Sequence, residues 1–162
     1  MRKIIFLDID GVLNTKFWYG QGKKDKYGPT FDPTAVANLK KILDETGADI
    51  VISSSWKSFG LSMLQRMWKY RNLPSKIIDV TPDCLDDEML LHVDLDNVDL
   101  LYNRGCEIKV WLKKHEKDIS HYVILDDVKD ILPEQESYFV WVDPDSGITK
   151  GNVVQAIMIL NK

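Results

Sequence analysis

Short apolar runs recur along the chain and predict buried β-strands. Residues 4–7 are all apolar and rich in β-branched side chains, a pattern typical of a strand that is covered on both faces of a parallel sheet. We expect this first strand at the centre of the sheet. Similar runs predict four more strands, at residues 50–52, 77–80, 122–125 and 138–142.

Apolar residues at helical spacing lie between these runs. Asp32 and Pro33 are typical of an N-cap and a first helical residue, and Gly47 is typical of a helix end. The apolar residues between them that recur at helical spacing are Val36, Leu39, Ile42 and Leu43. Further helices are predicted at residues 61–70, 107–115 and 153–160, and a loop rich in Gly, Lys and Tyr at residues 20–29.

Strands that alternate with helices predict an α/β fold, with a doubly wound parallel sheet of about five strands and helices on both faces. The length suits a single domain over residues 1–162. Residues 81–103 carry many acidic side chains, and we expect a hairpin or an irregular insertion there. Because ligands bind at the carboxyl ends of strands in such folds, the polar residues that follow the strands are the candidates for chemistry.

Composition and charge narrow the classes of protein that fit. The chain is 44% hydrophobic and 28% charged, as in soluble globular proteins. Its net charge of -4 disfavours the binding of a polyanion such as nucleic acid, except at a local basic patch. No apolar stretch is long enough to span a membrane, and Asp8 interrupts the first run too early for a signal peptide, so we expect a cytoplasmic protein. Cys84 and Cys106 lack a paired spacing and are interpreted as reduced thiols.

Acidic residues gather at two predicted strand ends. Asp8 and Asp10 follow the first strand, where side chains two residues apart point the same way. Asp126 and Asp127 follow the fourth strand, with Asp130 three residues later. Buried like charges need a cation or a shared proton, and Mg²⁺ prefers oxygen ligands. The alternative interpretation of the first cluster is an ordinary turn after the strand, and that of the second is a helix N-cap.

Two further segments could bind a phosphate group. Ser53, Ser54 and Ser55 follow the second predicted strand and offer hydroxyl groups and backbone amides to an anion. Arg104 lies just before the helix predicted at residues 107–115. A serine run is also common in plain loops, and a lone arginine is more often a solvated surface residue. Neither segment identifies a phosphate site by itself.

Four features together resemble the four motifs of the haloacid dehalogenase (HAD) superfamily, and the resemblance covers most of the chain. In chain order they are DIDGVLN, VISSSWK, the arginine before a helix, and VILDD. The strings RGCEIKVWL, LDDVKD and SGIT before the last helix resemble a small subgroup of HAD domains in phage and RNA-repair proteins. The resemblance implies a HAD-like Rossmannoid fold and a magnesium-dependent phosphatase that forms an aspartyl phosphate.

Residue by residue, the resemblance implies that Asp8 is the nucleophile and Asp10 the acid and base. It implies that Mg²⁺ is held by Asp8, the backbone carbonyl of Asp10 and Asp126, with Asp127 or Asp130 in support.

The same resemblance assigns phosphate-binding roles. Ser54 best matches the serine of the second motif. Ser53 matches nearly as well, since the sequence does not fix the strand register that would separate the two serines. Arg104 takes the place of the basic residue of the third motif, which is usually lysine, and Lys57 and Lys109 are alternatives. The serine, the cation and the metal would together offset the charge of the transition state.

Other classes share part of this pattern. A response-regulator receiver domain also carries an aspartyl phosphate, but its adjacent acids come at the first strand, whereas here they come late. A catalytically silent phosphate-binding module would have lost a catalytic position, and none is missing. A dehalogenase would need neither Asp10 nor a metal, and the chain has no GxxxxGK[ST] motif of a kinase.

The spacing of the motifs bears on the size of the substrate. HAD enzymes close over small metabolites with a cap inserted after the first motif or between the second and third. Here the gaps leave no room for a folded cap and only a possible small lid near residues 81–103. An uncapped site would admit a bulky substrate.

The loop after the first motif interleaves basic and aromatic residues, which suits single-stranded nucleic acid. They are Lys16, Lys23, Lys24 and Lys26 with Phe17, Trp18, Tyr19 and Tyr27. The alternative is a solvated loop whose aromatic rings pack on the core. We therefore expect a phosphatase for the terminal phosphates of nucleic acid or for nucleotides, while the choice of 3′ or 5′ phosphate and the oligomeric state stay open.

Overall fold

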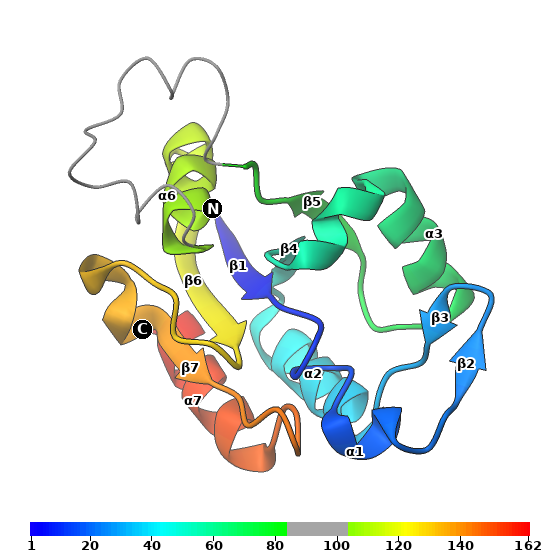
Figure 1. Ribbon diagram of the computed structural model, residues 1–162. Helices are drawn as coiled ribbons and strands as arrows, with labels where there is room; N and C mark the ends of the chain where they lie inside the picture. The colour runs from blue at the N-terminus through cyan, green and yellow to red at the C-terminus, as the bar shows by residue number, and fades with distance from the viewer. Residues whose placement is uncertain (84–103) are drawn as a thin grey trace.

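Five parallel strands form the central sheet of the protein, which we describe from a computed structural model over residues 1–83 and 104–162. The strand order is β5-β4-β1-β6-β7, so the strand that begins the chain lies in the middle (Figure 1). The strands are β1 (Arg2–Leu7), β4 (Asp49–Ile52), β5 (Ile77–Val80), β6 (Ile119–Asp126) and β7 (Phe139–Trp141). The five predicted strands and the α/β fold with a parallel sheet are confirmed.

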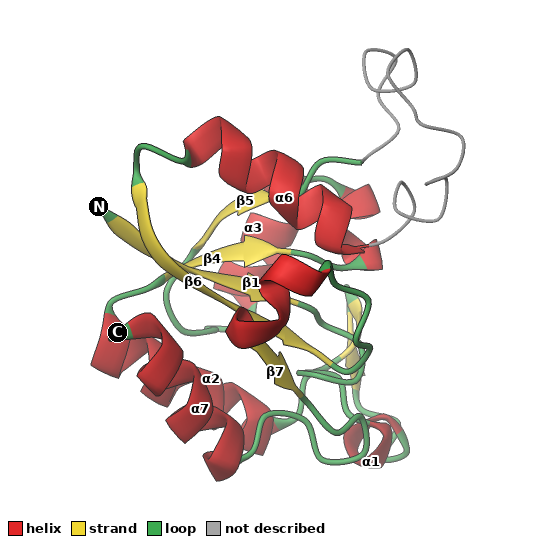
Figure 2. Ribbon diagram, turned by 90° about the vertical axis from the view of Figure 1, so that its left-hand side faces the viewer, coloured by secondary structure: helices red, strands yellow, loops and turns green. Residues whose placement is uncertain are grey.

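Helices cover both faces of this sheet (Figure 2). They are α2 (Pro33–Thr46), α3 (Leu61–Tyr70), α6 (Arg104–His115) and α7 (Lys150–Leu160). The helices α2, α3 and α7 share one core with Ile5 and Leu7 of β1. On the other face, Trp111 of α6 packs edge-on against the ring of Phe6 at 5.4 Å. Since alternate side chains of a strand point to opposite faces, β1 is buried on both sides, as its sequence predicts.

The predicted ends of α2 are confirmed, whereas the predicted start of α6 is wrong. Asp32 accepts a hydrogen bond from the amide of Thr34 at 2.9 Å, and Gly47 ends α2 with a φ of 66°, as predicted. In contrast, α6 already includes Arg104, so this arginine belongs to the helix and does not precede it.

Short elements occupy the segment between β1 and α2, where the sequence predicts a loop. They are α1 (Lys16–Tyr19) and an antiparallel hairpin of β2 (Lys24–Asp25) and β3 (Gly28–Pro29). Thr15 caps α1 by accepting a hydrogen bond from the amide of Trp18 at 3.1 Å. Arg71, which follows α3, makes two hydrogen bonds of 2.9 Å to the carboxylate of Asp25. Contacts with distant residues therefore hold the hairpin, and a local pattern does not reveal it.

The insertion that the sequence predicts near residues 81–103 lies outside the described residues from residue 84 onward, and Cys84 lies there too. Cys106 is half-buried on α6. Within residues 1–83 and 104–162, none of the helices has the length and the apolar character that crossing a membrane requires.

Candidate active site

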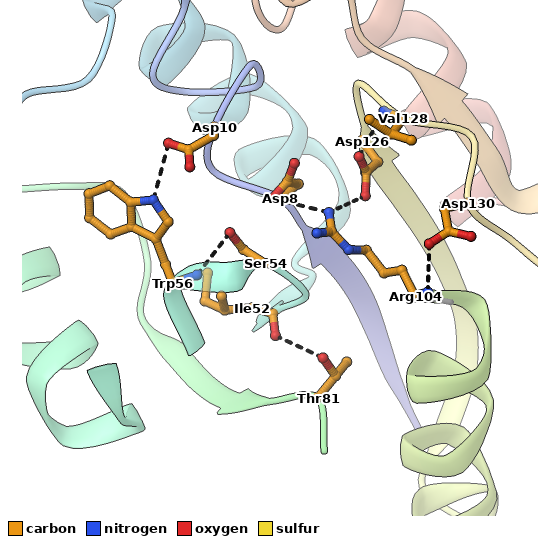
Figure 3. A network of polar contacts seen from close by, with 10 residues as sticks. All are labelled: Asp8, Asp10, Ile52, Ser54, Trp56, Thr81, Arg104, Asp126, Val128 and Asp130. Carbon is orange, nitrogen blue, oxygen red and sulfur yellow. Dashed lines mark hydrogen bonds and ion pairs between the residues drawn. The ribbon is translucent and has the colours of Figure 1, made fainter. Parts of the chain in front are cut away.

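Two buried aspartates meet at the carboxyl ends of β1 and β6. Leu7 and Leu125 are partners in the parallel register, and the amide of Asp8 donates to the carbonyl of Leu125 at 3.0 Å. The side chains that follow these partners are almost fully buried, since Asp8 is 5% exposed and Asp126 is 2% exposed. The pairing of the two strands therefore brings both carboxylates into one site (Figure 3).

Arg104 lies between these two carboxylates (Figure 3). Its Nη1 is 3.2 Å from Oδ1 of Asp8 and 2.5 Å from Oδ2 of Asp126. A cation in this position offsets the repulsion between two buried anions. The arginine that the sequence assigns to phosphate binding thus lies in contact with the residue assigned as the nucleophile.

The loop after β6 fixes the position of Arg104 at the start of α6. Asp130 accepts a hydrogen bond from the amide of Arg104 through Oδ2 at 3.1 Å, and another from the amide of Gly105 through its backbone carbonyl at 2.9 Å. Gly105 approaches this loop so closely that an added Cβ would lie 2.5 Å from the backbone nitrogen of Leu132. The side chain of Asp130 therefore holds the helix that carries the arginine.

Burial raises the pKa of both central carboxyl groups. The pKa of Asp8 rises from 3.8 to about 7, because its carboxyl group is desolvated and lies near the charge of Asp126, while Arg104 opposes the rise. Burial also raises the pKa of Asp126, again against the effect of Arg104. Even with the arginine in contact, more positive charge would stabilise the ionised pair.

Three carboxylates form a group that suits a divalent cation. Oxygen atoms of Asp8, Asp126 and Asp127 lie within 4.8 Å of one another. Gly11, with a φ of 77°, passes so close that an added Cβ would lie 2.5 Å from Oδ2 of Asp127. Because carboxylate oxygens are ligands that Mg²⁺ prefers, this donor set fits that ion. Of the two supporting acids that the sequence left open, Asp127 belongs to this group, whereas Asp130 holds α6.

Asp10 lies at the edge of the site and is exposed. Its Oδ1 accepts hydrogen bonds from Nε1 of Trp56 at 3.1 Å and from Nδ2 of Asn14 at 3.3 Å (Figure 3 shows the first of these). The family resemblance implies that Asp10 binds the metal through its backbone carbonyl and that its carboxyl group acts as the acid and base. The two aspartates of the first motif thus lie in different environments.

Neither Trp56 nor Asn14 is singled out by the sequence pattern. Trp56 directly follows the serine run in a short 3₁₀ helix, η1 (Ser55–Phe59), and Asn14 closes the turn at the end of the first motif. Asn14 lies within DIDGVLN and Trp56 within VISSSWK, and this position inside the motif segments is the signal that could have identified them.

The two candidate serines have different surroundings. The hydroxyl group of Ser54 hydrogen-bonds to Asp8, which lowers the pKa of that carboxyl group, and it accepts a hydrogen bond from the amide of Trp56 at 3.3 Å. The hydroxyl group of Ser53 is buried and has no hydrogen-bond partner among the described residues, although its amide donates to the carbonyl of Leu7 at 3.0 Å. Of the two, Ser54 is therefore the serine whose hydroxyl group contacts the candidate nucleophile.

The two lysines that are alternatives to Arg104 form ion pairs elsewhere. Nζ of Lys57 lies 2.7 Å from Glu107, and Nζ of Lys109 lies 2.7 Å from Glu134 on the surface. Within the described parts of the chain, Arg104 is the basic side chain that contacts the candidate nucleophile.

A family model matches most of the chain. The family model described as the HAD domain in Swiss Army Knife RNA repair proteins matches residues 4–153, a range that contains every residue of the site. No curated protein and no solved structure matches the chain.

Proposed function

Since the chain belongs to the family of HAD domains in Swiss Army Knife RNA repair proteins, we propose that it is a phosphatase that hydrolyses phosphomonoesters through an aspartyl phosphate. Membership of the family indicates a hydrolase of the HAD type in general. The observation that carries the finer proposal is that the two aspartates of the first motif lie in different environments. Asp8 is buried against Arg104, whereas Asp10 is exposed and hydrogen-bonded to Trp56.

The two aspartates divide the chemistry between them. An Oδ atom of Asp8 forms a bond to phosphorus as the bond from phosphorus to the leaving oxygen breaks, and Asp10 gives its proton to that oxygen. In the second step Asp10 takes a proton from water, the water oxygen bonds to phosphorus, and the bond between Asp8 and phosphorus breaks. Inorganic phosphate leaves, and both carboxyl groups return to their starting states.

Positive charge around Asp8 allows a carboxylate to approach an anionic phosphate. Arg104 and the hydroxyl group of Ser54 are in contact with Asp8 and would stabilise negative charge on the phosphoryl oxygens. Bound Mg²⁺ would supply further positive charge at the same place. The residues that would hold it are Asp8, Asp126, Asp127 and the backbone carbonyl of Asp10.

The substrates that we propose are terminal phosphates of nucleic acid, with free nucleotides as the second choice. The description of the family, RNA repair, supports this class. The exposed position of Asp10 also supports it, because the group attached to the leaving oxygen can extend away from the protein. With a net charge of -4, binding of a polyanion must rest on local positive charge and on aromatic contacts.

The two alternative functions receive less support. A receiver-like phosphoacceptor is disfavoured because the family match is to a HAD domain. A silent phosphate-binding module is disfavoured because Asp8 and Asp10 both have the surroundings that their proposed roles require.

Trapping of the phosphoenzyme tests the proposed nucleophile. Native protein that is mixed with a labelled phosphomonoester and quenched in acid should carry a covalent, base-labile phosphate, and Asp8→Asn should carry none and turn nothing over. Asp44→Asn changes an exposed aspartate that pairs with Lys40 on α2, and it should behave as the native protein does. Full activity of Asp8→Asn would overturn the proposal.

A further inference from the structure

A cavity of about 530 Å³ opens beside Asp10. Its wall contains two residues of the candidate active site, Asp10 and Asp127, and extends to Lys16 and Tyr19 of α1. Residues three apart on a helix lie on the same side, which explains why these two residues of α1 line it together. We call this space the α1 cavity, and it is continuous with the site at which the leaving group would be protonated.

We propose that the α1 cavity binds the nucleoside that carries the scissile phosphate, with the base stacked on Tyr19. The inference rests on the proposed function, since it assumes that Asp10 protonates the leaving oxygen. Whatever is attached to that oxygen must extend from Asp10, and the α1 cavity begins there. Its volume lies within the roughly 300–1,000 Å³ of typical small-molecule sites.

The aromatic rings of this region divide into covered and open ones. Lys23 lies over the ring of Trp18 at 4.5 Å, and Lys26 lies over the rings of Tyr27 and Tyr70 at 5.2 and 4.3 Å. These lysines and rings therefore contact one another, which the sequence alone does not indicate.

Tyr19 differs from these rings. It is 60% exposed, lines the cavity, and has no aromatic or cation–π contact with any residue in the described parts of the chain. An open aromatic face beside a phosphate site is what base stacking requires.

Lys16 can supply a positive charge at the same place. Its Nζ lies 3.4 Å from Asp145, and both side chains are largely exposed. Exposed ion pairs contribute little to stability, so a phosphodiester of the substrate can replace Asp145 at small cost. In the α1 cavity, Tyr19 would thus stack on a base and Lys16 would bind an adjacent phosphate. This pair of contacts favours a nucleotide over a sugar phosphate.

The base dependence of hydrolysis tests this inference. A nucleoside 5′-monophosphate and ribose 5-phosphate carry the phosphate on the same carbon and differ by the base, so kcat/KM on the pair isolates its contribution. Tyr19→Ala should lower kcat/KM on the nucleotide by roughly 10- to 100-fold, the usual range for loss of one stacking ring, and should leave ribose 5-phosphate unchanged. Tyr19→Phe should keep the native preference because the ring is retained.

Phe17→Ala is the matched control, because Phe17 is on the same helix, is 67% exposed and does not line the cavity. It should leave both substrates unaffected. Equal losses on both substrates in Tyr19→Ala, or losses of the same size in Phe17→Ala, would overturn the inference.

A binding measurement separates failure of the inference from failure of the proposed function. Nucleoside monophosphate is titrated into Asp8→Asn, and into the same protein that also carries Tyr19→Ala, with intrinsic fluorescence as the readout. Weaker binding in the double variant supports the α1 cavity even if the native protein hydrolyses nothing. Unchanged binding overturns it, even if hydrolysis by Asp8 is established.

Discussion

Trp56 donates a hydrogen bond from its indole Nε1 to Oδ1 of Asp10 over 3.1 Å. The ring that carries this donor packs against the rings of Phe31 and Phe59, with 5.7 Å between ring centroids in both cases. Its backbone amide donates to Ser54, the serine that contacts the candidate nucleophile. Trp56 therefore links the serine that we propose binds phosphate to the proposed acid and base, and we interpret it as a positioning residue.

Trp56→Phe should keep the aromatic packing and remove the hydrogen bond. A loosely held Asp10 matters most when the leaving oxygen needs a proton, so kcat should fall by roughly tenfold on an alkyl phosphate, about the effect of losing one hydrogen bond to a charged group. On 4-nitrophenyl phosphate, whose leaving group needs little protonation, kcat should change little. Steady-state rates on the two esters measure this difference.

Phe59→Leu serves as the packing control for this variant. It disturbs the neighbour of the same indole ring without touching the hydrogen bond, so its effect should be equal on both esters. An equal loss on both esters in Trp56→Phe would mean that the tryptophan supports the fold alone.

Arg104→Met should separate the stability of the site from its activity. Without the guanidinium group, Asp8 and Asp126 repel each other, so the metal-free protein should unfold more easily. Excess Mg²⁺ should restore much of this stability but not the rate, because the contact with phosphate is lost. We expect kcat/KM to fall by roughly 10²–10³-fold, as for other groups that stabilise transition-state charge.

Lys109→Met is the control for this prediction, since Lys109 is the surface alternative that pairs with Glu134. It should leave both the rate and the response to Mg²⁺ unchanged. Native activity of Arg104→Met would mean that another basic residue has the role of the third motif.

The sequence predicts the parts of this protein that depend on regular patterns. Buried strands are visible as apolar runs, and parallel strands end at one edge of the sheet. The meeting of Asp8 and Asp126 therefore follows from the strand prediction and needs no knowledge of side-chain contacts. The N-cap at Asp32 and the helix end at Gly47 are equally local and equally visible.

The rest depends on tertiary contacts that have no local signature. Hairpin strands of two residues show no periodicity, and the salt bridge that holds Asp25 comes from Arg71, which lies 46 residues away in the sequence. The choice between Ser53 and Ser54 depends on where β4 ends relative to β1, which the residue types do not encode. Likewise, Asp130 looks like a metal ligand in the sequence, but in the fold it accepts a hydrogen bond from the amide of Arg104.

The pH dependence of stability should reveal the buried carboxyl group of Asp8. Its pKa is about 7 in the folded protein and near 3.8 in the unfolded chain, so between these values the folded protein holds a proton that the unfolded chain has lost. The free energy of unfolding in EDTA should therefore fall as the pH rises from about 4 to 7, and this contribution should level off above pH 7. Asp8→Asn lacks the group, and the difference between the two proteins isolates it.

Mg²⁺ should reverse this trend. Carboxylate ligands must be ionised to bind a metal, so binding releases protons and strengthens as the pH rises. The same concentration of Mg²⁺ should stabilise the native protein more at pH 8 than at pH 5, because the dissociation constant is lower at pH 8. Where that concentration is 100 times the dissociation constant, the stabilisation is about 2.7 kcal/mol. Asp126→Asn should abolish the increase, as melting temperatures with and without EDTA will show. A metal-independent melting temperature at pH 8 would exclude the three-carboxylate site.

Gly11→Ala should damage the metal site through a single methyl group. Gly11 has a φ of 77°, and its added Cβ would lie 2.5 Å from Oδ2 of Asp127, so the carboxylate must move. Gly22→Ala is a matched control, because Gly22 has a φ of 67° and nothing lies within 4 Å of its added Cβ. Both variants should lose about 1 kcal/mol or more of stability to backbone strain. Only Gly11→Ala should also weaken Mg²⁺ binding, measured by calorimetry, and lower kcat/KM at limiting metal. If the two variants bind Mg²⁺ equally well, Asp127 is not a ligand, and the site must be rebuilt around Asp8 and Asp126 alone.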